Sequence, residues 1–264
     1  MQLRPIPTRL LIALVALSTL TVTSTAWGQD PPKKKKEGSK TVTKAIKKVD
    51  RQILSYNPAK AKEMLEPVMA EKDPRIDAAL GQILILQEQY DEGIAKLQAA
   101  ARSSDDPVIS LALGDAQVTA RKRGEASSTF EQVVAQATAL VAADPNDTQA
   151  RFALGAAQQR LKQYDEAISH LTQAKAQDAT NPRIPFELGL AQMSRGDNQA
   201  AFDQLTSAIE MYSGYAYAYY YRALAANQIG RKDITVNDLD RFLALAPNAP
   251  EASKATRILA SARG

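Results

Sequence analysis

The sequence predicts an all-α protein of the solenoid class, because one pattern recurs along most of its 264 residues. The pair Leu-Gly appears four times, at Leu80-Gly81, Leu113-Gly114, Leu154-Gly155 and Leu188-Gly189. A small residue follows each leucine by 13 positions, and a large apolar residue follows four positions later. Prolines mark most junctions between copies, at Pro107, Pro145, Pro182 and Pro247. Self-similarity at such intervals is typical of stacked supersecondary units.

The pattern resembles the tetratricopeptide repeat, a 34-residue unit with Leu-Gly, alanine, a large apolar residue and a closing proline at these offsets. The segments 89–97 (QYDEGIAKL) and 163–171 (QYDEAISHL) are near copies. The resemblance covers residues 74–249. It implies a right-handed α-solenoid of stacked antiparallel helix pairs, in which each pair buries its apolar face only against the next pair.

In this register the array has five units, and further segments lie on either side. The units are 74–106, 107–147, 148–181, 182–215 and 216–249. The last unit is weakened, since Arg222-Ala223 stands where Leu-Gly is expected. Residues 41–73 read as a degenerate helix pair. Residues 250–264 read as a capping helix whose Glu251, Lys254 and Arg257 face water.

One interval of 41 residues departs from the repeat length. The seven extra residues lie between Val133 and Pro145, and seven residues are close to two helical turns. The second helix of that unit should therefore extend by roughly 10 Å. Ala139, Leu140 and Val141 lie on the extension, where they either cap a neighbouring helix or form a docking ridge.

The N-terminus reads as an export signal. Arg4 and Arg9 precede a short apolar run, LLIALVALSTLTV, and small residues at Ala26 and Gly28 predict cleavage after Gly28. We expect an exported protein, periplasmic or extracellular, with an uncleaved signal as the alternative. An exported protein of this kind is expected to be bacterial.

The basic charge of the chain is concentrated near this end. The net charge is +4, but residues 29–40 carry five lysines against two acids, and residues 41–264 are close to neutral. Residues 29–40 read as a disordered Lys-rich tether. Nucleic-acid binding by the folded part is not expected, and membrane contact is expected only through the Lys33–Lys36 run or an uncleaved signal.

The stretch YSGYAYAYYY, residues 212–221, holds six of the nine tyrosines. In the repeat register it falls on a first helix, and the helical wheel puts Tyr219 in the core. Tyr217 and Tyr220 point away from that face. The resemblance implies that they line the concave groove of the array.

Equivalent first-helix positions extend this groove toward the N-terminus. We predict that residues 148–228 bind a partner peptide or protein, because aromatic, methionine and arginine side chains are common in protein-recognition surfaces. The alternative is that the rings stabilise their own helix pairs. The predicted groove residues are Phe152, Arg160, Phe186, Leu190, Met193, Tyr217, Tyr220 and Asn227.

Enzymatic chemistry is not predicted. The chain has no cysteine and one histidine, His170, which excludes thiolate sites and multi-histidine metal sites. No glycine-rich phosphate loop is present, and no cofactor, metal or catalytic residue is expected. The sequence thus predicts an extracytoplasmic interaction scaffold or assembly factor whose partner is a protein of the cell envelope. The alternative is a self-assembling structural protein.

Overall fold

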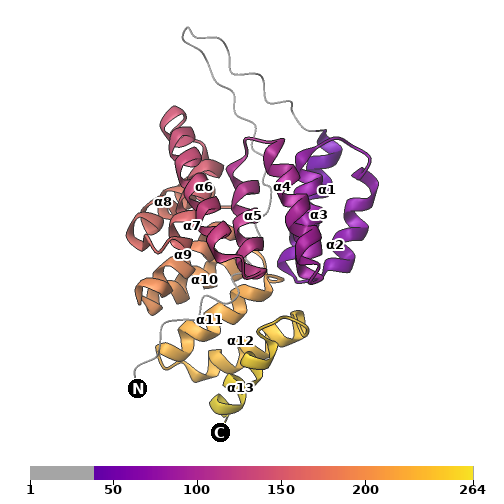
Figure 1. Cartoon of the computed structure of the whole chain (residues 1–264). Coiled ribbons are helices and arrows are strands. Elements are labelled where there is room, and N and C mark those ends of the chain that lie inside the picture. The colour runs from indigo at the N-terminus through magenta and orange to yellow at the C-terminus, as the bar shows by residue number, and fades with distance from the viewer. Residues whose placement is uncertain (1–38, 264) are drawn as a thin grey trace.

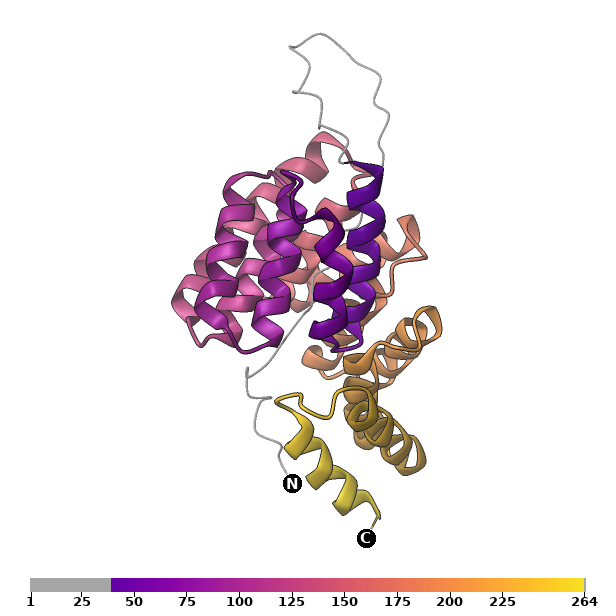
Figure 2. The same cartoon turned by 90° about the vertical axis from the view of Figure 1, so that its right-hand side faces the viewer.

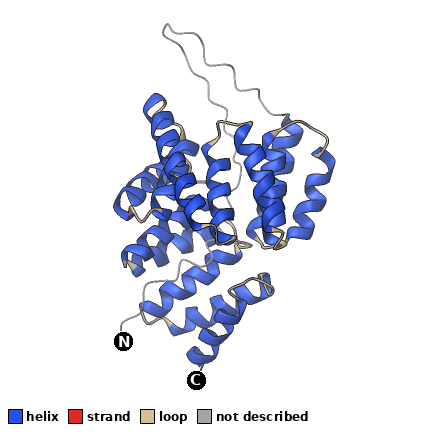
Figure 3. Cartoon of the chain, in the orientation of Figure 1, coloured by secondary structure: helices blue, strands red, loops and turns tan. Residues whose placement is uncertain are grey.

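The structure, a computed structural model, describes residues 39–263, and their regular structure consists of helices alone (Figure 1, Figure 3). The all-α prediction is confirmed for these residues. The helices are α1 (Lys40–Leu54), α2 (Pro58–Leu65), the 3₁₀ turn η1 (Glu66–Val68), α3 (Pro74–Leu86), α4 (Tyr90–Arg102), α5 (Pro107–Thr119), α6 (Arg123–Ala143), α7 (Thr148–Arg160), α8 (Tyr164–Gln177), α9 (Arg183–Arg195), α10 (Asn198–Met211), α11 (Ala216–Gln228), α12 (Lys232–Leu245) and α13 (Ala252–Arg263).

The first helix of a unit starts where the sequence supplies a cap. The Asp73 side chain accepts a hydrogen bond from the Arg75 N–H, and the Asp106 side chain accepts one from the Val108 N–H. Proline follows at the first helical position in both units, where the missing N–H is not needed. Caps of this kind place the start of α3 and α5 at the junctions that the repeat pattern marks.

The recurrent glycines are sites of close contact between the two helices of a unit. A Cβ added to Gly155 would lie 2.7 Å from Leu171 Cγ on α8. A Cβ added to Gly114 would lie 2.4 Å from the Phe130 ring on α6. Glycine is needed at these Leu-Gly positions because the second helix packs directly against the backbone of the first.

The turn between the two helices has one residue with positive φ in every helix pair from α1–α2 to α11–α12. Glycine takes this position at Gly196 and Gly230, where it is unstrained. The other four turns use residues with a Cβ, namely Tyr56 (φ 55°), Glu88 (63°), Arg121 (64°) and Lys162 (66°). The α1–α2 turn thus has the same geometry as the repeat units that follow it.

First helices form the inner side of the array. Contacts join α1, α3, α5, α7, α9 and α11 in sequence, and each second helix packs between the first helices of its own unit and the next. One buried apolar cluster runs through the chain from Val42 to Leu259. Figure 2 shows the array curving so that the indigo N-terminal hairpin lies beside the orange segment.

The extended helix is α6, with 21 residues against 13 or 14 in the other second helices of the repeat array. Its final turns project from the array in Figure 1. Ala137 is buried, Ala139 is exposed, and Leu140 and Val141 are half-buried.

The export signal (1–28) and nearly all of the tether (29–40) lie outside the described residues. Among the residues that the structure describes, no helix combines the length and apolar character needed to cross a membrane.

Replacing Gly155 with alanine should destabilise the chain by about 1–3 kcal/mol, because the added methyl overlaps Leu171. Gly124→Ala is the matched control, since a Cβ there meets nothing within 4 Å. Urea unfolding followed by circular dichroism measures both. Equal stabilities for the two variants would contradict the close-contact role of Gly155.

Candidate functional site

The candidate site is the inner face formed by the first helices, and most of its predicted residues are buried there. Phe152, Phe186, Leu190, Met193, Tyr217 and Tyr220 are at most 8% exposed. The Arg160 side chain is 3% exposed. Asn227 is the exposed member of the set. Seven of the eight predicted side chains are therefore buried and do not line an open groove, and a partner role for them stays a prediction that requires the array to open.

The tyrosine stretch forms an aromatic cluster in the interior. Tyr217 and Tyr220 pack against Phe242 of α12, with ring centroids 5.5 and 5.0 Å apart. Phe186 of α9 packs against Tyr215 at 4.6 Å. The contacts of Tyr217 and Tyr220 with Phe242 lie within the α11–α12 pair, as in the alternative that the rings stabilise their own helix pair.

The burial of the tyrosines differs from the prediction. Tyr219, expected in the core, is half-buried, and its hydroxyl donates to the Ser213 carbonyl at 3.1 Å. Tyr217 and Tyr220 are buried because other elements cover the inner face. The α1–α2 turn reaches this face, with Tyr56 and Tyr217 centroids 6.0 Å apart.

The capping helix also covers the inner face. Glu251, which was expected to face water, is 7% exposed and accepts a hydrogen bond from the Tyr217 hydroxyl at 2.6 Å. Burial raises the pKa of Glu251, while the Tyr217 hydrogen bond opposes the shift. The side chain thus joins the start of α13 to the core of the preceding unit.

Arg160 binds two carboxylates inside the array. Its Nε lies 3.0 Å from Asp115 Oδ1 on α5, and its Nη2 lies 3.0 Å from Glu187 Oε1 on α9. A second contact joins Arg160 Nη1 to Glu187. The guanidinium therefore bridges three consecutive units. Removing one partner from a buried group of this kind leaves an uncompensated charge, so the cluster is first of all structural.

Arg183 is the second buried guanidinium of the inner face. Arg183 is 3% exposed, and its Nε and Nη2 have no hydrogen-bond partner among the described residues. Burial lowers the pKa of Arg183, and the charges of Asp50 on α1 and Glu187 on α9 oppose that shift. A buried arginine with two unpaired N–H groups is a costly feature that a carboxylate would stabilise.

Asp115 is the titratable member of this cluster. Burial raises its pKa to about 7, since desolvation outweighs the attraction of Arg160 and the Glu187 charge adds to the rise. Its ionisation therefore falls near neutral pH.

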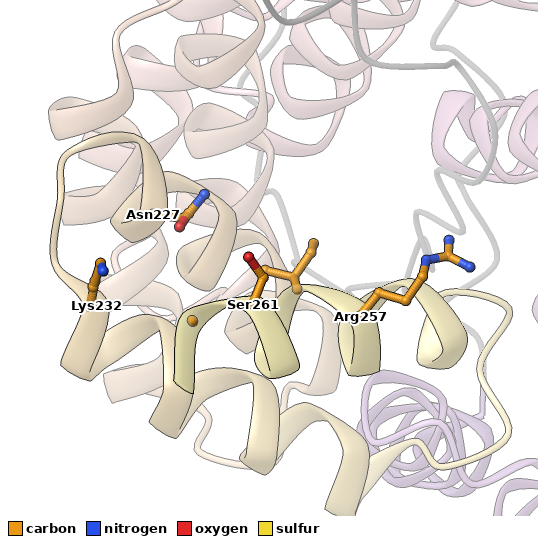
Figure 4. Close-up of a pocket in the computed structure, with 6 residues that line it drawn as sticks. Asn227, Lys232, Arg257 and Ser261 are labelled. Atoms are coloured by element: carbon orange, nitrogen blue, oxygen red, sulfur yellow. The ribbon is translucent and has the colours of Figure 1, made fainter. Parts of the chain in front are cut away.

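An open hollow remains at the C-terminal end of the inner face. It has a volume of about 430 Å³ and is lined by Asn227, Lys232, Arg257, Ile258, Ser261 and Ala262. Figure 4 shows Asn227 above Ser261, with Lys232 and Arg257 at opposite ends. The lining holds two cations, an amide and a hydroxyl, and no carboxylate. This composition favours a ligand that carries negative charge.

The buried charges and the α1–α2 turn contacts were missed by sequence reasoning. Asp115, Glu187 and Arg183 occupy different repeat positions, so no periodic signal marks them. Asp50 and Tyr56 lie outside the recognisable units. One weak signal was available in the sequence. Charged residues on first helices stand among positions that are mostly apolar or small, which indicates that these charges are buried.

The histidine has a structural environment. His170 is half-buried, and its Nδ1 lies 2.8 Å from Gln158 Oε1, which fixes Nδ1 as the donor. Burial lowers the pKa of His170, which favours the neutral ring. Within residues 39–263, no group of three or more potential metal ligands is found.

Comparison with protein families gives a match to the tetratricopeptide repeat over residues 111–182 and 186–233. These two segments together make up just under half of the chain and lie within the array that the sequence assigned to this repeat. The match supports that assignment. No curated protein matches the chain.

Solved structures with the same architecture support the fold. TTC0263, a thermophilic TPR protein of Thermus thermophilus, is 18% identical, with a TM-score of 0.55 over 72% of this chain and 98% of that one. The APC/C hetero-tetramer Cut9-Hcn1 is 13% identical, with a TM-score of 0.58 over 83% of this chain and 42% of that one. The likeness to these two structures shows the fold alone. MamA is 24% identical, with a TM-score of 0.48 over 57% of this chain and 84% of that one.

The stability of the chain should fall as pH rises from about 4 to about 7, through the contribution of Asp115. In this window the folded chain holds a proton that the unfolded chain has released, so unfolding is favoured as pH rises. The slope from one such group is at most about 1.4 kcal/mol per pH unit.

Asp115→Asn should flatten this part of the profile, because the amide keeps the shape and cannot ionise. Urea unfolding at about pH 5 and about pH 7.5 compares the stability of the variant with that of the parent. Identical pH slopes in the two proteins would refute the role of Asp115.

Proposed function

We propose that the chain is an extracytoplasmic scaffold that binds another protein of the cell envelope through the open C-terminal end of its inner face. The tetratricopeptide fold suggests a protein-interaction scaffold. The observation that carries the proposal is the hollow between α11, the start of α12, and α13, since most of the remaining inner face is filled.

The chemistry of the hollow indicates the kind of partner. Lys232 and Arg257 are both exposed, and neither has an ion-pair partner among the described residues. Asn227 and Ser261 lie between them as neutral hydrogen-bonding groups. An extended acidic segment would place carboxylates at both ends of the hollow and backbone groups at its centre.

Self-assembly is the second candidate function, and α6 is the observation that favours it. Its projecting end carries Leu140 and Val141 as half-buried apolar side chains that are not part of the core cluster. A copy packed on this end would bury them further. Sedimentation at increasing concentration tests this function, and a constant monomer mass would exclude it.

Charge reversal at the hollow, Lys232→Glu with Arg257→Glu, should lower partner capture about tenfold, because an acidic segment is then repelled. The measurement is quantitative crosslinking and affinity capture of the tagged chain from its own envelope fraction. Arg102→Glu with Arg123→Glu is the matched control, since both arginines are exposed on second helices and the net charge changes equally. Equal loss in both variants, or loss in neither, would contradict binding at the hollow.

Export predicts a mature chain that begins at Gln29. Mass spectrometry of the protein isolated from the cell envelope should find this N-terminus. Ala26→Arg should block cleavage, because the position three residues before the cut requires a small side chain. An intact N-terminus in the parent protein, found in the cytoplasmic fraction, would refute the export proposal.

A further inference from the structure

The α1–α2 turn makes contacts at the far end of the array. The Tyr212 hydroxyl donates to the Arg51 carbonyl at 3.1 Å. The Ser55 hydroxyl lies 2.7 Å from the same Tyr212 oxygen. Because Tyr212 gives its single proton to the carbonyl, Ser55 is the donor in the second bond. These residues are more than 150 positions apart, in the first helix pair and at the end of α10.

Two further contacts join the same regions. The Tyr56 ring packs against Tyr217 of α11, which in turn donates to Glu251. The charge of Asp50 on α1 acts on the buried Arg183 of α9, whose Nε and Nη2 have no hydrogen-bond partner among the described residues. The segment from Asp50 to Tyr56 thus presents a carboxylate, a hydroxyl and an aromatic ring to the inner face.

The contacts between the α1–α2 turn and the far end of the array differ from the packing between neighbouring units. In a stacked array each unit is held by its immediate neighbours. The contacts of Ser55 and Tyr56 with α10 and α11 skip several units, so they can break while every neighbouring interface stays intact. Because these contacts are few, we expect their loss to cost much less free energy than global unfolding.

We propose that residues 50–57, which comprise the end of α1 and the α1–α2 turn, are a built-in occupant of the inner face, and that the release of this segment controls access to that face. The closed state is the one described here. In the open state Tyr212, Tyr217 and Arg183 face solvent. A displacing partner must then offer what the turn offers, a carboxylate for Arg183 and a hydroxyl and a ring for the two tyrosines. The control of access rests on the proposed scaffold function. The docking of the turn on the inner face does not depend on that function.

Opening is measured by the distance between spin labels in the full chain. The chain has no cysteine, so Lys48→Cys on α1 and Asn237→Cys on α12 place two labels at exposed positions. Ser55→Ala with Tyr56→Gly removes the hydroxyl and the ring, and glycine suits the positive φ of that position. We expect the long-distance population to rise about tenfold, with helical content unchanged.

Gln87→Ala with Glu88→Gly is the matched control. It makes the same kind of change in the α3–α4 turn, where Glu88 also has positive φ and both side chains are exposed. The control should keep the parent distance distribution. An unchanged distribution in the Ser55/Tyr56 variant, or equal opening in the control, would overturn the proposal.

A disulfide tests the closed state independently. A Cβ at residue 214 would lie 2.9 Å from Ser55 Oγ, so Ser55→Cys with Gly214→Cys should form a bond on mild oxidation. The Tyr212 ring tip must shift to allow it. Failure of the bond to form in the folded chain would mean that the turn is not docked. We expect the reduced chain to capture more partner than the oxidised chain, because the locked turn leaves only the open hollow for binding. Equal capture by both chains would refute the control of access but not the scaffold function. The distance measurement tests the closure itself, because it needs no partner.

Discussion

Burial of one helix pair by the next is the constraint on which the rest of this structure depends. No unit has a core of its own, so the apolar positions that recur from unit to unit must meet across every interface. Within each pair, the glycines at 81, 114, 155 and 189 let the second helix approach the backbone of the first. The array is therefore stabilised along its length by many similar interfaces.

The buried charges limit how the first helices can be arranged. Arg160 holds Asp115 and Glu187 at fixed positions on three successive first helices. Buried ionic groups of this kind are weak evidence for net stability, but they penalise any arrangement that separates them. We infer that the cluster fixes the curvature of the inner face, and that this curvature brings the α1–α2 turn to α10 and α11.

Curvature and function are linked through what remains accessible. The repeat register alone predicts that Phe186, Tyr217 and Tyr220 line a groove. In this chain they are at most 2% exposed, and the hollow beside Asn227 is left at the C-terminal end. The chain combines an open polar site with a closed aromatic interior, and the proposed release of the α1–α2 turn would connect the two.

The sequence by itself determined the helical fold, the repeat register and the extension of α6, because these depend on spacing along the chain. The Leu-Gly pairs and junction prolines sit at regular intervals, and local chemistry such as the Asp73 cap acts within a few residues. Only the tertiary structure decided which side of α11 is buried. The covering groups, Tyr56 and Glu251, come from outside the repeat unit that contains Tyr217. The ionic cluster was hidden for the same reason: Asp115, Arg160 and Glu187 meet through the packing of three units, and no regular spacing relates them.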